Sequence, residues 1–213
     1  MPRARLPALA VAAALPLLLT LSAPALAQRA AHGPPDWPCV QRLIPELTAA
    51  TIWTGPPLDG LETDWWDDGE LARVVRFSAA RETSPEAAVE RVEEYIAGLD
   101  EDEREEQLTL LFAGLFQELG RERSRTIEAV RRYSRGQVGQ LEQISTLVDR
   151  LEEARSGNDV PPEDVERLEQ ELFWQRRVFQ DRQGSLRALC QQPYLLEERL
   201  GRLVRVITAN LPT

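Results

Sequence analysis

Two stretches of the chain carry apolar residues at the alternating steps of three and four that define a heptad repeat. The first stretch runs from Ile127 to Leu151, and the second runs from Val165 to Leu189. A short segment that contains Gly and Pro joins them, so the two helices must lie side by side and run in opposite directions. The pattern therefore predicts an antiparallel, coiled-coil-like helical hairpin at about 121–190.

The seam of this hairpin can be written out from the repeat. In the first helix it consists of Ile127, Val130, Ser134, Gln137, Leu141, Ile144, Val148 and Leu151. In the second helix it consists of Val165, Leu168, Leu172, Gln175, Phe179, Arg182, Leu186 and Leu189. If Leu151 packs opposite Val165, the polar seam residues meet at one level. This polar belt has two interpretations: it fixes the register or bends the hairpin, or it is a docking point for a partner. Its residues are Ser134, Gln137, Gln175 and Arg182.

Shorter helices are predicted on both sides of the hairpin. Asp67 or Asp68 can cap a helix at 69–82, and Ser84-Pro85 begins another at 85–98. A helix at 101–120 leads into the hairpin, and a last helix is expected at 194–209. Pro193 is expected to separate that last helix from the hairpin, because proline removes a helical hydrogen bond. The predicted fold class is all-α: a helical domain at 69–213 that consists of a bundle and a protruding hairpin.

An irregular segment rich in Pro and Trp is predicted at 28–68, before the helices. Its prolines and glycines are typical of turns rather than of helices or strands. The tryptophans have two interpretations. They fold back to fill the helical bundle, or Trp53, Trp65 and Trp66 form part of an aromatic surface for a partner.

The first residues have the composition of a secretory leader. Arg3 and Arg5 precede an apolar run from Leu6 to Leu21, and Ala25-Leu26-Ala27 supplies the small residues of a cleavage site. We therefore expect a signal peptide at 1–27 and a periplasmic or secreted protein with no membrane span after cleavage. An uncleaved anchor is the alternative, although the run is shorter than the roughly 20 residues that span a bilayer.

Cys39 and Cys190 are the two cysteines of the chain. In an oxidising compartment such a pair is usually a disulfide. Closing so long a loop stabilises by about 4–5 kcal/mol in the chain-entropy treatment. The alternatives are two free thiols or a metal site, but two sulfurs and one His are too few ligands for structural zinc.

Charge and composition exclude several classes of function. The formal net charge is −10, which disfavours binding to nucleic acid. All 25 basic residues are arginine, so lysine-based catalysis is absent. The one histidine, His32, lies in the predicted irregular segment at 28–68, and a lone flexible His is a poor general base and metal site. No glycine-rich phosphate loop and no Cys-x-x-Cys pair occurs, so we expect no catalytic residue, no cofactor and no metal.

One acidic cluster remains to be considered. Asp64, Asp67 and Asp68 lie beside Trp65 and Trp66, where they either cap and solvate a helix start or bind a metal or a sugar. Taken together, these features favour a non-enzymatic interaction protein: an adaptor, accessory or chaperone-like protein whose partner is a periplasmic protein. The alternatives are a small-ligand or metal-ion binding protein that uses the acidic Trp cluster and, more remotely, a carboxylate-based enzyme. Heptad spacing also permits a homodimer.

Overall fold

The computed structural model describes residues 34–157 and 159–212. The predicted signal peptide at 1–27 and His32 lie outside the described residues. Within them the regular elements are all helical, so the predicted all-α class is confirmed. The elements are two short 3-10 helices, η1 (Ala49–Thr51) and η2 (Leu58–Gly60), and the helices α1 (Gly69–Ala79), α2 (Pro85–Ala97), α3 (Arg104–Ser156) and α4 (Pro162–Ala209).

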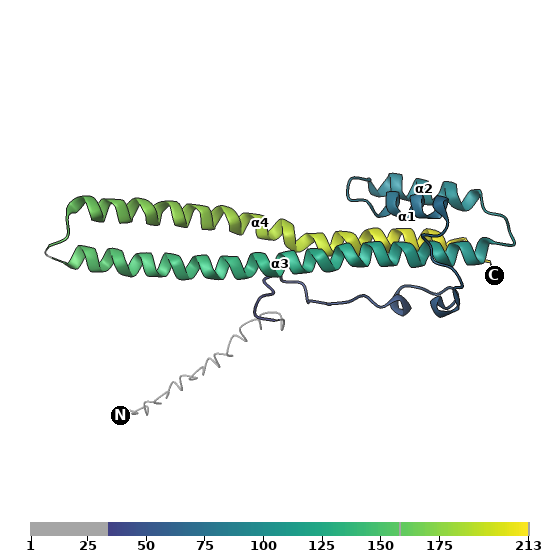
Figure 1. Cartoon of the computed structure of the whole chain (residues 1–213), viewed down its shortest axis with the longest axis horizontal. Coiled ribbons are helices and arrows are strands. Elements are labelled where there is room, and N and C mark those ends of the chain that lie inside the picture. Colours follow the sequence, from purple (N-terminus) through teal and green to yellow (C-terminus); the bar gives the residue numbers. More distant parts are fainter. Residues whose placement is uncertain (1–33, 158, 213) are drawn as a thin grey trace, which may run out of the picture. The chain divides into compact units, whose positions relative to one another are not determined.

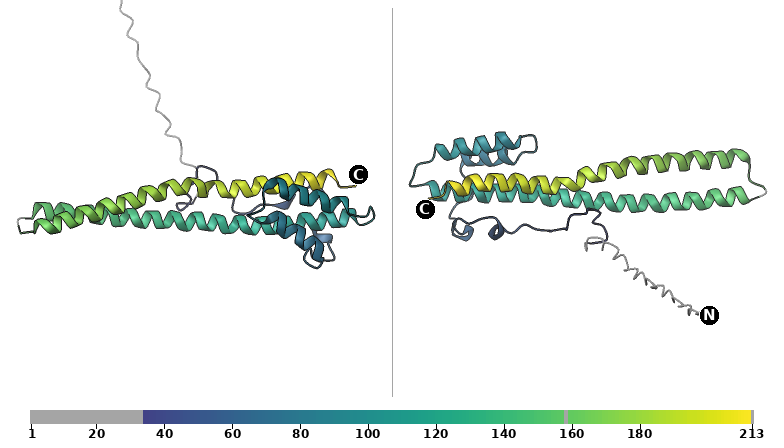
Figure 2. Two further views of the ribbon diagram at one scale, coloured as in Figure 1. Left: turned by 90° about the horizontal axis from the view of Figure 1, so that it is seen from above. Right: turned by 180° about the vertical axis from the view of Figure 1, so that it is seen from behind.

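The two longest helices, α3 and α4, form the predicted antiparallel hairpin (Figure 1). α1 and α2 pack against each other and against the end of the hairpin that holds the start of α3 and the end of α4 (Figures 1 and 2). We call this end the base. We call residues 136–182, from Gly136 through the turn to Arg182, the arm. In the described part of the chain no helix is both long and apolar enough to cross a membrane.

The helix boundaries correct two predictions. α3 continues through residue 120 without a break, so the predicted helix at 101–120 and the first helix of the hairpin are one helix of 53 residues. α4 also continues through Pro193, which lies buried inside it. The missing N–H of a proline costs about 3 kcal/mol in a helix interior. Here Cys190 and Glu197 hold α4 to its neighbours on both sides of Pro193, and this packing outweighs the cost. Figure 1 shows α4 bending between its green part and its yellow part, and an internal proline commonly causes such a bend.

The hydrophobic core lies in the base. Side chains from all four α-helices meet there, and a second, small cluster lies between α3 and α4 in the arm. The fully buried members of the base core include Leu71, Val74, Val92, Leu108, Leu111, Phe112, Leu115, Leu200, Leu203 and Ile207. The arm cluster consists of Leu147, Leu151, Leu168 and Leu172.

The starts of α1 and α2 follow the predicted capping. The Asp68 carboxylate accepts hydrogen bonds from the backbone N–H groups of Glu70 and Leu71, at 2.7 and 3.2 Å. The Ser84 hydroxyl accepts one from the N–H of Ala87 at 3.1 Å, and Pro85 occupies the first helical position. These acceptors satisfy N–H groups that the helix itself leaves free.

The Pro/Trp-rich segment lies along the base, and its tryptophans complete the core. Trp53 stacks on Phe112 with ring centroids 4.2 Å apart, and the indole N–H of Trp65 donates to the Gln117 amide oxygen at 2.6 Å. Trp65 also lies so close to Gly114 that an added Cβ would meet its ring at 3.0 Å. The interpretation in which tryptophans fold back onto the bundle therefore holds for Trp53 and Trp65.

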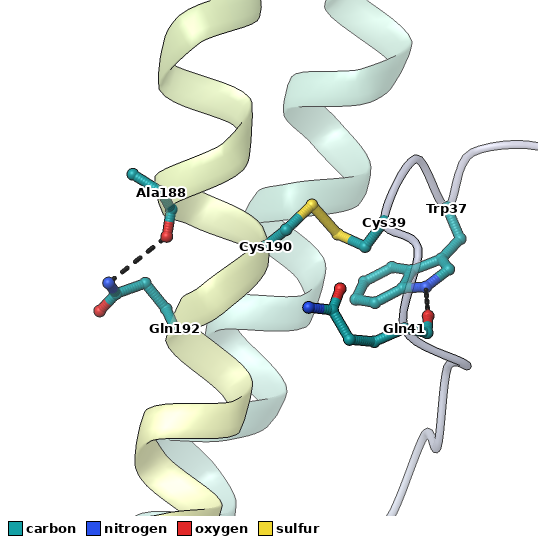
Figure 3. The surroundings of a disulfide bond; sticks show 6 residues. All are labelled: Trp37, Cys39, Gln41, Ala188, Cys190 and Gln192. Carbon is teal, nitrogen blue, oxygen red and sulfur yellow. Dashed lines mark hydrogen bonds between the residues drawn. A yellow bond between two sulfur atoms is a disulfide. The ribbon is translucent and has the colours of Figure 1, made fainter.

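A disulfide joins Cys39 to Cys190, as predicted, with the two Cα atoms 5.5 Å apart (Figure 3). Beside it, the Trp37 indole N–H donates to the Gln41 carbonyl at 2.7 Å. Arg123, buried in α3, reinforces this attachment. Its guanidinium pairs with Glu197 at 2.6 Å and donates to the backbone carbonyls of Ile44 and Pro45. The N-terminal segment is thus fixed to both helices of the hairpin.

Candidate interaction surfaces of the arm

The seam of the arm differs from the predicted one at Leu141 and at Val148, where the neighbouring Gln140 and Leu147 are the buried residues instead. Leu141 is 48% exposed, whereas Gln140, which was not predicted in the seam, is 6% exposed. The shift begins near the level at which the contacts between Asp36 and α3 end. Asp36 contacts Arg131 and Arg135, so α3 is covered from two directions up to this level. Beyond it only α4 covers α3, and the buried stripe moves to Gln140, Leu147 and Leu151.

The polar belt lies where the repeat placed it. The Tyr133 hydroxyl donates to the Arg182 carbonyl at 2.7 Å, which agrees with the predicted register in which Leu151 packs opposite Val165. The Arg182 guanidinium donates to the Gln140 amide oxygen at 2.8 Å, and the Gln140 amide lies 3.4 Å from the Gln175 carbonyl. Ser134 is buried, Gln175 is half-buried and Arg182 is exposed. The belt is therefore a cross-helix network organised by Gln140.

Gln137 is the weak point of that belt. Its side chain is buried, and neither its amide oxygen nor its amide nitrogen has a hydrogen-bond partner among the described residues. An unpartnered buried polar group costs roughly 1–3 kcal/mol. We therefore expect the middle of the arm to be less stable than the leucine cluster nearer the turn.

Large apolar side chains point away from the seam around the same level. Phe173 and Trp174 are both 63% exposed and pack edge to face with ring centroids 5.3 Å apart. The other exposed apolar residues of the arm are Val138, Leu141 and Val178. Solvated aromatic side chains in a group are typical of binding surfaces.

These side chains divide between two faces of the hairpin. Phe173 lines a groove of about 560 Å³ together with Val148 and Leu172. Val138, Leu141 and Val148 follow one another at helical spacing, so they form one stripe on the same side. We call this side the Phe173 face.

The opposite side has a different character. Trp174 and Val178 line a groove of about 490 Å³ together with Gly136 and Gly139. A Cβ at either glycine would meet nothing within 4 Å, so no internal contact requires a glycine there. A second hollow with Gly139, Thr146 and Arg150 in its lining continues the groove toward the tip. We call this side the Trp174 face. Its groove shares no lining residue with the groove of the Phe173 face.

The acidic Trp cluster is arranged as a helix start. Asp68 is the cap of α1, and the Asp67 carboxylate accepts from the backbone N–H of Asp64 at 3.3 Å. Trp53 and Trp65 are only 8% and 6% exposed. Of the three tryptophans predicted as interaction residues, Trp66 alone presents a large exposed surface. The most exposed aromatic side chains that could form a binding surface therefore lie in the arm and not in the N-terminal segment.

Asp36 lies at the junction between base and arm. One of its carboxylate oxygens accepts from Arg131 Nε at 3.0 Å and from Arg135 Nη1 at 2.6 Å. The hydrogen bond from Arg131 is the main reason why the pKa of the Asp36 carboxyl is lowered from its ordinary value. This pair of contacts holds the start of the described chain against α3.

Sequence reasoning missed Phe173 and Trp174 as surface residues. The available signal was their position: both lie between the seam residues Leu172 and Gln175, where a two-helix seam leaves a side chain in solvent. Comparisons with protein-family models, curated proteins and solved structures find no match for this chain.

Proposed function

We propose that the protein is a secreted, non-enzymatic interaction protein that binds a helical segment of a partner protein in the Trp174 groove. One observation carries the proposal: an aromatic side chain, 63% exposed, lines a groove together with two glycines on an arm that has only a small core of its own. No internal contact requires a glycine at either position. The disulfide supports the expected oxidising compartment.

The shape of the groove favours a helix as its occupant. From Gly136 to Arg150 its lining follows α3 for roughly 20 Å, at about 1.5 Å per residue. A helix of about 14 residues would fit this length, and glycines allow close helix–helix approach at interaxial distances of about 8–10 Å. The described helices offer no strand edge for an extended peptide to pair with.

The lining also indicates the chemistry of that helix. Trp174, Val178 and Leu147 are apolar, while Gln143, Glu142 and Arg150 supply polar groups. An amphipathic helix with apolar residues every three to four positions would match both the apolar and the polar groups of this lining.

The proposal can be tested with neighbouring residues that are equally exposed. A photo-crosslinking residue at position 174 of the intact chain should form an adduct with one other protein, and a residue at 173 should not form that adduct. The helix identified in the adduct should bind the wild-type protein. Trp174→Ala should weaken this binding by roughly 30-fold or more, as for an aromatic anchor, and Phe173→Ala should leave it unchanged.

Two results would overturn the proposal. One is the same adduct from both positions, which would indicate non-specific contact. The other is an unchanged dissociation constant for Trp174→Ala together with an unchanged circular dichroism spectrum.

A further inference from the structure

The Phe173 face carries charges of opposite sign on the two sides of its apolar centre. Toward the tip it presents Glu152 and Glu169 in the groove, and Glu166 one turn from Glu169. Toward the base it presents Arg176 and Arg177. All five side chains are exposed.

Nearby charged side chains reduce the difference in charge between the two halves of the face but do not remove it. Arg155 pairs with Glu169 at 2.6 Å, and Asp181 pairs with Arg177 at 3.4 Å. Both pairs are solvent-exposed, where such contacts are worth little and exchange readily. Glu152, Glu166 and Arg176 have no ion-pair partner among the described residues. The acidic half and the basic half of the face therefore remain distinct.

The apolar centre lies between the two halves. The contact of Gln140 with Gln175 sets the register of α3 against α4. This register places Leu141 and Phe173 at nearly the same level, with the acids on the tip side and the arginines on the base side. An apolar patch with acids on one side and bases on the other is complementary to a copy of itself turned end over end.

We propose that a second copy of this chain binds the Phe173 face, with the two arms antiparallel and a two-fold axis crossing the arms at the level of Leu141 and Phe173. Such an axis turns each arm end over end while keeping α4 on the partner's α4 and α3 on the partner's α3. Phe173 then lies against its own copy. Glu169 of one copy faces Arg177 of the other, and Glu166 lies about one turn beyond Arg177, in both directions.

The opposite orientation is disfavoured by the same charges. If the two-fold axis ran along the arm, the tips would lie together and the acids would face acids. The antiparallel pairing also leaves the Trp174 groove on the outside of both copies. The inference does not depend on the proposed function, because it uses the other face of the hairpin.

Charge exchange tests this pairing in the intact chain. The double variant Arg176→Glu/Arg177→Glu and the double variant Glu166→Arg/Glu169→Arg should each weaken the dimer by about a hundredfold, because like charges then oppose each other at both ends. An equimolar mixture of the two variants should recover a heterodimer, because acids again face bases. Sedimentation equilibrium at several protein concentrations measures these states, and circular dichroism verifies that each variant is folded.

A control variant carries the same charge change on the other side. Arg125 and Arg132 precede Gly139 by two and one heptads, so they share its side of α3. Arg125→Glu/Arg132→Glu should leave the dimer intact. The inference is overturned if the wild-type chain is monomeric up to about 100 μM, well above the concentrations at which standard-size interfaces associate. It is also overturned if the mixture of charge variants stays monomeric, or if Trp174→Ala abolishes the dimer while Phe173→Ala does not.

Discussion

The base and the arm are built from the same two long helices, yet they bury their side chains to different extents. In the base, α1, α2 and two tryptophans cover the hairpin, and residues such as Leu111 and Phe112 have no exposed surface. In the arm, each helix has only the other as neighbour, the seam contains Gln137 and Gln140, and two aromatic side chains remain in solvent. The difference indicates that the base contains most of the hydrophobic core, whereas the arm leaves large apolar side chains exposed.

The largest expected effect concerns the two cores. Phe112→Ala should lower the free energy of unfolding by about 4 kcal/mol, because a fully buried ring leaves a cavity among several helices. Leu168→Ala should lower it by only about 2 kcal/mol, because solvent can reach the cavity in a two-helix seam. Urea titration followed by circular dichroism measures both values. Equal losses would contradict the contrast between base and arm.

Glycine-to-alanine substitutions should change the stability of the protein in opposite directions in the base and in the arm. An alanine at 114 would place its Cβ 2.8 Å from Val75 and 3.0 Å from Trp65, so Gly114→Ala should destabilise the protein by about 2 kcal/mol. Gly139→Ala meets nothing within 4 Å and should stabilise α3 by about 0.5–1 kcal/mol. Thermal unfolding of both variants provides the comparison. A stabilising Gly114→Ala would show that α1 and α3 pack less closely than described.

The polar belt offers a test within the arm itself. Gln137→Leu removes two buried polar atoms that have no partner among the described residues, so it should stabilise the protein by about 1 kcal/mol. Hydrogen exchange should show slower exchange of the backbone amides of α3 around 134–144, with little change at 108–119. Gln140→Leu is the matched control and should destabilise, because it leaves Arg182 and Gln175 without their contact. A destabilising Gln137→Leu would indicate that an ordered water occupies the belt.

The smallest expected effect is the pH dependence of the stability that the contacts of Asp36 contribute at the junction between base and arm. Hydrogen bonds from Arg131 lower the pKa of Asp36 in the folded protein, so the carboxylate stabilises the fold above its ordinary pKa of about 3.9. This contribution is lost as the pH falls through the lowered pKa. The melting temperature of Asp36→Asn should therefore be below that of the wild type at pH 6 and should approach it as the pH falls through the lowered pKa of Asp36. A constant difference across this range would exclude the titration of Asp36 as its cause.

Local sequence signals were sufficient for the hairpin and the two helix starts, and the disulfide followed from the number of cysteines and the expected compartment. The heptad steps and the capping residues Asp68 and Ser84 act within a few positions of the chain, so they can be read without the fold. The continuation of α4 through Pro193 could not be read in this way. It depends on a disulfide and on an ion pair from Arg123 to Glu197, which are long-range contacts.

The candidate surface was predicted only in part, for a related reason. The repeat predicted the level of the polar belt. It did not predict that Gln140 takes the place of Leu141 in the buried seam, a change that begins near the level where the contacts of Asp36 with α3 end. The exposure of Trp174 depends on the absence of a third helix over the described arm. Periodicity shows which residues share a stripe, but it does not show how many neighbours cover that stripe.

The disulfide has a mechanical consequence. Cys39 and Cys190 are separated by 151 residues, and α1, α2, all of α3 and the whole arm lie inside the closed loop. A tension applied between Pro38 and the end of α4 passes through the sulfur–sulfur bond directly into residues 190–209. The chain inside the loop, roughly 500 Å long when extended at about 3.4 Å per residue, therefore does not lengthen under such a tension. The arm stays unstretched while the two ends of the molecule are pulled apart.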